Sequence, residues 1–127
     1  MKRNVERQER GWAGHFILGD RCRFRRNTLL TCGNIRIVVS TVGLVPDALN
    51  TSGTKFMELG YNRYYETMAF HSNPADTRYH DIDVGRGVHF ESPWAISEVD
   101  ADDRANEMHE RVVAEITEGL SRGNTYE

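Results

Sequence analysis

Alternating apolar and polar positions predict several short strands in the first two thirds of the chain. The clearest strand is 34–42, NIRIVVSTV, because β-branched residues dominate it and favour extended backbone. Residues 21–30 form a second strand, in which arginines alternate with apolar residues. Gly33 and Asn34 lie between the two strands and are typical of a turn. We therefore expect a β-hairpin across residues 21–42.

Weaker patterns extend this sheet on both sides of the hairpin. Residues 11–18 and 61–70 are expected to be strands, and residues 79–91 a strand or a hairpin bent at its glycines. The turn-rich residues 45–55 are expected to be a loop. The polar residues 1–10 are expected to be a frayed lead-in.

The last part of the chain has a different period and predicts one long helix within residues 97–122. Asp100 or Ser97 can cap its N-terminus, and acids at 102 and 103 suit the helix dipole there. Spacings of three and four give one apolar stripe, which must pack on the sheet or on the same helix of another subunit. The stripe consists of Ala105, Met108, Val112, Ile116 and Leu120.

These elements predict an α+β fold in a single domain over residues 1–127. An N-terminal antiparallel sheet of four to six strands, mostly within residues 11–91, is followed by the long C-terminal helix. The length of 127 residues is ordinary for one domain.

The charge distribution adds a point that the strand pattern does not give. The net charge is -3, yet residues 1–36 hold nine basic residues and three acidic ones, whereas residues 91–127 hold three and ten. Such asymmetry favours an anion-binding region or contact between the two parts, and the acidic second part makes nucleic acid an unlikely partner. The apolar runs are too short for a membrane span, and the start lacks a signal peptide. We therefore expect a cytoplasmic protein, with Cys22 and Cys32 as reduced, part-buried thiols.

The arginine-rich strand is the first candidate site. Strand alternation places Arg23, Arg25 and Asn27 on one face, where guanidinium groups can bind phosphate in bidentate fashion. Arg26 falls on the apolar face, so it requires a carboxylate or a bound anion as partner. The alternative is structural: the first two arginines are a solvated edge, and Arg26 pairs with a helix carboxylate. On the helix, Arg104 and Arg111 are seven residues apart and share a second exposed face.

Evidence for an enzyme is thin. His80, Asp81, Asp83 and His89 could share a metal site, but hydrogen-bonding surface residues are the more ordinary interpretation. No established nucleotide-loop, zinc or nucleophile motif is present in the sequence. We therefore expect no catalytic residue, no metal and no cofactor. The remaining alternatives are a metal-assisted phosphodiesterase acting on cyclic nucleotides and a single-stranded nucleic-acid binder.

Four segments carry a resemblance to a known family: GWAGHFILGDRCRFRRNTLL, IRIVVSTVG, RYYETMAF and ANEMHERVVAEI. In these, the chain is similar to the anti-Thoeris sponge family, small proteins carried by phages and prophages. The likeness covers most of residues 11–118. It implies an N-terminal antiparallel sheet, a C-terminal helix, and assembly into dimers or hexamers.

The resemblance also implies a function. Members sequester cyclic nucleotide immune signals, namely cyclic ADP-ribose isomers and, in some members, cyclic di- or trinucleotides, without cleaving them, so this chain is expected to act in an infected bacterial host cell. It implies that arginines and aromatic residues at subunit interfaces bind the ligand, and it leaves the choice among the adjacent arginines open. The residues it offers are Arg23, Arg25, Arg26 and Asn27 on the strand, Asn106, His109 and Arg111 on the helix, and Phe90, Ser92 and Trp94 between them.

Overall fold

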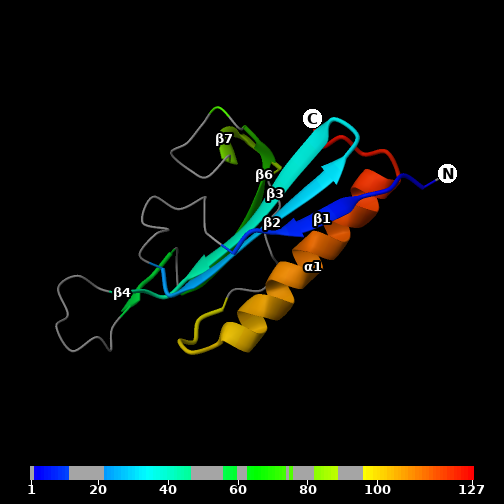
Figure 1. The fold of residues 1–127 in the computed structure, drawn as a ribbon. Helices are drawn as coiled ribbons and strands as arrows, with labels where there is room; N and C mark the ends of the chain where they lie inside the picture. Colours follow the sequence, from blue (N-terminus) through cyan, green and yellow to red (C-terminus); the bar gives the residue numbers. More distant parts are fainter. Residues whose placement is uncertain are drawn as a thin grey trace.

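The fold is a five-stranded antiparallel sheet with one long helix across one face (Figure 1). A computed structural model describes residues 2–11, 22–46, 56–59, 63–73, 75, 82–88 and 96–127. The elements are β1 (Glu6–Glu9), β2 (Phe24–Cys32), β3 (Ile35–Gly43), β4 (Val45–Pro46), β5 (Phe56–Met57), β6 (Tyr65–Ser72), β7 (Ile82–Gly87) and α1 (Asp102–Ser121). The strand order in the large sheet is β1-β2-β3-β6-β7, and β4 pairs with β5 separately. This arrangement confirms the predicted α+β class.

The predicted hairpin is the centre of the sheet. β2 and β3 pair in regular antiparallel register, with Thr28 opposite Val39 and Asn27 opposite Ser40. Gly33 in the connecting turn has a φ of 62°, which a glycine adopts without the strain that a Cβ atom would cause. Each of the two strands is nine residues long. One side-chain face of the hairpin is directed toward α1.

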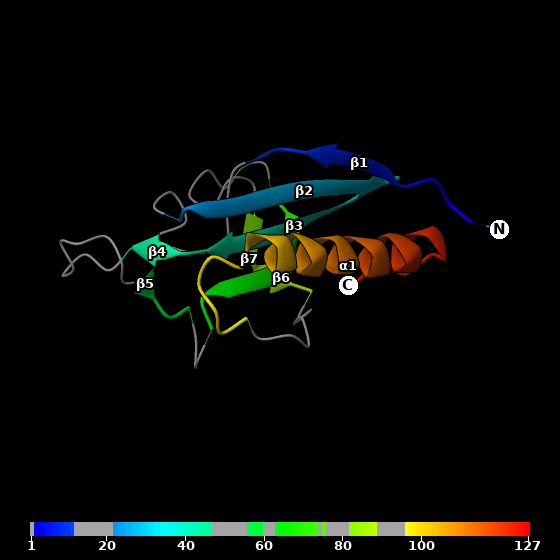
Figure 2. The same cartoon turned by 90° about the horizontal axis from the view of Figure 1, so that it is seen from below.

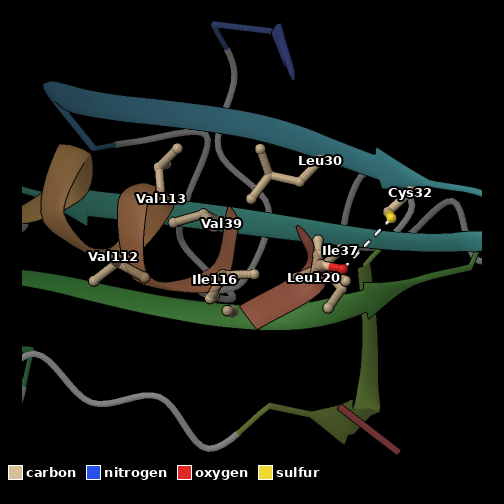
Figure 3. Close-up of a cluster of buried hydrophobic side chains, with 9 residues drawn as sticks. Leu30, Cys32, Ile37, Val39, Val112, Val113, Ile116 and Leu120 are labelled. Carbon is tan, nitrogen blue, oxygen red and sulfur yellow. Dashed lines mark hydrogen bonds between the residues drawn. The ribbon is translucent and has the colours of Figure 1, made fainter. Parts of the chain in front are cut away.

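The helix lies along the strands and covers β2, β3 and β6 (Figure 2). All five residues of its predicted apolar stripe are buried, so the stripe packs on the sheet of its own chain. The main cluster joins Leu30, Ile37 and Val39 of the sheet to Val112, Val113, Ile116 and Leu120 of the helix (Figure 3). At its end the Cys32 thiol donates a hydrogen bond to the Leu120 carbonyl at 3.7 Å. Cys22 and Cys32 are both free and buried.

The opposite face of the sheet is also buried along its middle. Leu29, Val38, Phe70 and Ile82 form a separate apolar cluster there. Strand alternation is the reason, since Leu29 and Val38 are cross-strand partners whose neighbours point to the helix. The sheet therefore separates two packed layers, and a residue's position along a strand decides to which layer it belongs.

The start of the helix differs from the sequence prediction. The N-cap position is Ala101, which makes no side-chain capping bond, and Asp100 has a φ of 56°. The Tyr65 hydroxyl instead accepts from the Ala101 N–H and donates to the Asp102 carboxylate, each at 2.9 Å. Burial and the bond to Asp102 raise the pKa of Tyr65 to about 12. A tyrosine of the sheet thus anchors the helix start in place of a local cap.

One further prediction needs correction. The expected lead-in contains β1, which pairs with β2 from Glu6 opposite Thr31 to Glu9 opposite Thr28. The helix, Asp102–Ser121, lies within the predicted range 97–122. The strand expected at 11–18 lies, apart from Gly11, outside the described residues. Within the part of the chain that the structure describes, no helix combines the length and apolar character needed to cross a membrane.

Candidate functional site

Arg26 has the partner that its position on the apolar face requires. Its guanidinium forms ion pairs with Glu9 of β1 and, at 2.9 Å, with Glu110 of α1. Arg7 donates to both carboxylate oxygens of Glu110, at 2.8 and 2.5 Å. Hydrogen bonds from Arg7, followed by those from Arg26, lower the pKa of Glu110 to about 2. Two arginines and two carboxylates therefore bind the first strand, the second strand and the helix together.

His109 lies directly beneath this ion-pair network and is fully buried. Its Nε2 is 2.7 Å from the Thr28 hydroxyl, and its Nδ1 is 2.7 Å from the Thr41 hydroxyl. The Thr28 hydroxyl donates to the Glu9 carboxylate, so it must accept from His109 Nε2–H, and Nδ1 must accept from Thr41. Burial, and then the nearby Arg26 charge, lower the pKa of His109 to about 3. His109 is therefore a neutral structural group whose two nitrogens are both occupied.

The structure also places three more of the predicted ligand residues, one beside Arg26 and two on the opposite face of the sheet. Asn106 accepts a hydrogen bond of 3.4 Å from Arg26, and Asn27 is fully buried on the other face of the sheet. Arg25 is exposed and lies opposite Val42, on the same face as Asn27. Their expected roles in ligand binding stay predictions. The arginine-rich strand is thus divided: one arginine links the strand to the helix, and the others face away from it.

Arg23 precedes β2 and is exposed. Its guanidinium lies 5.1 Å from the centre of the Phe56 ring, which is within cation–π range. This contact connects β2 to the small β4–β5 sheet. A ligand phosphate at Arg23 would therefore meet an arginine that already has an aromatic neighbour.

A pocket of about 150 Å³ opens beside the first half of α1. Arg104, Glu107 and Arg111 are exposed along its rim, while Ile96 and Met108 are buried. The predicted helix face therefore borders a real hollow with two guanidinium groups and an apolar floor. Arg104 also pairs with Glu98 at 2.6 Å, an exposed pair of the kind that contributes little to stability. An anion in the pocket would compete with the Glu98 carboxylate for Arg104, and the negative charge of Glu107 would repel that anion.

The remaining predicted residues fall outside the described part of the chain. Phe90, Ser92 and Trp94 belong to residues 89–95, which come directly before Ile96 in the sequence. His80, Asp81 and His89 of the metal hypothesis are likewise outside. Asp83 is described, and its carboxylate accepts from the Gly85 N–H at 3.0 Å. Among the described residues, no three His, Cys, Asp or Glu side chains are grouped as metal ligands would be.

Sequence reasoning missed the residues that surround these candidates. Glu9 lies in the segment expected to fray, and its pairing depends on β1 joining the sheet edge. Thr41 and Ser40 lie in the clearest predicted strand, but nothing in its alternation shows that one meets a histidine and the other a buried amide. Comparison with protein-family models, with curated protein sequences and with solved structures found no match to this chain.

Proposed function

We propose that this chain binds a small phosphorylated cyclic nucleotide and sequesters it without cleavage, as its resemblance to the anti-Thoeris sponge family implies. The observation that carries the proposal is the pocket beside α1, where Arg104 and Arg111 border the buried Ile96 and Met108. Guanidinium groups bind phosphate through two parallel N–H donors, and an apolar floor suits a base or ribose ring. The proposed setting is the cytoplasm of an infected bacterial cell.

The size of the pocket supports assembly as part of the proposal. Sites that enclose a drug-sized ligand occupy roughly 300–1,000 Å³, whereas this pocket measures about 150 Å³. A single chain therefore offers room for a phosphate or one ring, and a second subunit would have to cover the rest of the ligand. The proposed dimer or hexamer would place that second wall over the exposed arginines of α1.

Sequestration without turnover is favoured by the state of His109. General base catalysis requires a group with a pKa near the working pH and a free nitrogen. His109 has a pKa of about 3 and hydrogen bonds at both nitrogens. The histidine nearest to the helix arginines in sequence is therefore unsuited to proton transfer, whereas the arginines suit tight binding.

Isothermal titration calorimetry with cyclic ADP-ribose isomers and cyclic di- and trinucleotides tests the proposal. Arg111→Ala and Arg104→Ala should each weaken binding about tenfold or more, because a hydrogen-bonded charged group contributes about 1.5–3 kcal/mol. Arg122→Ala is the matched control, since Arg122 is an exposed arginine at the other end of α1 that pairs with Glu118. Ligand released by heating should have an unchanged mass. Absence of binding by every ligand, or equal weakening by the control, would refute the proposal, and cleaved ligand would favour the phosphodiesterase alternative.

A further inference from the structure

A second group of polar residues lies on the sheet face that the helix does not cover. Asn27 and Ser40 are cross-strand partners on β2 and β3, and each is 0% exposed. Arg10 continues the line of β1 beside them, since its backbone N–H donates to the Asn27 carbonyl at 2.7 Å. The three residues form a polar row across the sheet, one step along the strands from the apolar cluster around Leu29. A polar row buried at this depth needs a partner for each of its atoms.

The amide nitrogen of Asn27 and the hydroxyl of Ser40 have no such partner among the described residues. The Arg10 Nε–H donates to Asn27 Oδ1 at 2.8 Å, which identifies the oxygen of that amide and leaves its Nδ2 directed elsewhere. Asn27 Nδ2 and Ser40 Oγ are both buried without a hydrogen bond to any part of the chain that the structure describes. A buried donor without an acceptor costs about 1–3 kcal/mol. Two such atoms on facing residues indicate a common occupant.

The geometry of the pair indicates where that occupant would lie. Side chains directly opposite in an antiparallel pair have Cβ atoms about 5 Å apart. One oxygen atom between Asn27 and Ser40 can therefore accept from the amide Nδ2–H and from the hydroxyl at once. The acceptor of the amide is already used by Arg10, so Asn27 presents a donor, whereas the Ser40 hydroxyl can donate or accept. A water molecule can bridge the pair by accepting from the amide and donating to the hydroxyl, whereas an anionic oxygen accepts from both, so the surrounding charges decide between the two.

The surrounding charges favour an anion. Arg10 contributes a guanidinium beside Asn27. Arg25 lies two residues before Asn27 on the same face of β2 and is exposed, so it stands about 7 Å away along the strand, toward solvent. Of the acids that the described strands place on this face, Glu66 lies across Val42 from Arg25 and is ion-paired with Arg63 at 3.1 Å. Glu6 lies farther away, opposite Thr31. Among the described residues, positive charge therefore lies nearer to the donors than negative charge does.

We propose that Arg10, Arg25, Asn27 and Ser40 form a binding site for a phosphate-type oxyanion, either free phosphate or the phosphate group of an ester. Asn27 and Ser40 bind one oxygen from inside, and Arg25 binds the group from the solvent side. This site lies on the opposite face of the sheet from α1. It is independent of the pocket of Arg104 and Arg111, and the two proposals stand or fall separately.

Thermal unfolding at matched ionic strength tests the site with two probes, inorganic phosphate and ribose 5-phosphate, against chloride. Each should raise the melting temperature of the wild type, because a ligand that binds only the folded state stabilises it. Ser40→Ala should weaken binding about tenfold through loss of one hydrogen bond to a charged group. Arg25→Ala, an exposed position, gives the same test if the buried variant fails to fold. A response to phosphate alone identifies the free ion, and a response to both identifies the phosphoryl group.

Arg122→Ala serves as the control and should retain the full response to both probes, because Arg122 pairs with Glu118 and belongs to neither proposed site. The proposal is overturned if the wild type melts at the same temperature with every probe, or if Ser40→Ala and Arg25→Ala respond as strongly as the wild type. It is also overturned if the response survives in Ser40→Ala and disappears in Arg111→Ala, because the phosphate then binds beside α1.

Discussion

Acidification should weaken this fold through His109 before Glu110 is protonated. The imidazole is fully buried, and its pKa lies at about 3 against an ordinary value of 6.5. In the unfolded chain the same group takes up a proton below pH 6.5. The unfolded state therefore binds more protons than the folded state between these values, and the stabilising effect is lost as the pH falls through this window.

The magnitude follows from the pKa difference. Each unit of difference corresponds to about 1.4 kcal/mol, so complete loss near pH 3 would amount to roughly 5 kcal/mol. At pH 5 the unfolded imidazole is almost fully protonated, and the loss is about 2 kcal/mol. Glu110 contributes only at lower pH, because its pKa is lowered from 4.5 to about 2. The interval from pH 7 to pH 5 therefore isolates the histidine from this carboxylate.

Urea unfolding of the wild type and of His109→Gln at pH 7, 6 and 5 measures the effect. The variant should be less stable than the wild type at pH 7, and the difference should shrink by about 2 kcal/mol at pH 5. Taking the difference between the two proteins removes contributions from other groups that titrate in both. The imidazole resonances of His109 should remain those of the neutral ring down to pH 4. A difference that stays constant between pH 7 and pH 5, or a ring that titrates near 6.5, would refute the reasoning.

Three further predictions test the packing. Arg26→Ala should cost about 1–2 kcal/mol in urea unfolding, because Glu9 and Glu110 then keep only Arg7 as an ion-pair partner. Arg25→Ala should change stability by less than about 0.5 kcal/mol. Gly43→Ala should lower stability by about 1–3 kcal/mol, since the added methyl would collide with the Tyr65 ring; an unchanged melting temperature would contradict this. Gly119→Ala should stabilise α1 by about 0.5–1 kcal/mol only in a Tyr126→Ala background, because in the wild type the new methyl meets the Tyr126 hydroxyl. A double-mutant cycle measures that coupling, and additive effects would count against it.

The hairpin and the helix could be predicted because local pattern determines them. The apolar stripe of α1 and the turn at Gly33 appear directly in the sequence and are present in the structure. Alternation also predicted that Arg26 needs a partner. In the structure Arg26 forms ion pairs with Glu9 of β1 and Glu110 of α1. Which carboxylate would meet it depends on how the helix lies on the sheet, and no local pattern contains that information.

The candidate sites could be predicted only in part, for the same reason. Helix periodicity predicts that Arg104 and Arg111 share one face of the helix. The hollow beside them is also lined by Ile96, which lies outside the helix, so the helix pattern alone does not predict it. The edge strand β1 escaped prediction because its four residues are all polar and all exposed. Its place in the sheet comes from ion pairs with α1 and hydrogen bonds to β2 rather than from burial.

The contacts of β1 with α1 also set the order in which the chain can assemble. Arg7 and Glu110 are 103 positions apart, and the Arg3 N–H donates to the Ser121 carbonyl at 2.7 Å. Closing so long a loop is slow, whereas the hairpin of β2 and β3 forms between neighbours in sequence. During synthesis β1 leaves the ribosome first, but its helix partners are made last. Until the helix is made, β1 lacks its helix partners. Its charged and exposed residues oppose pairing with other chains during this time, as charges on edge strands generally do.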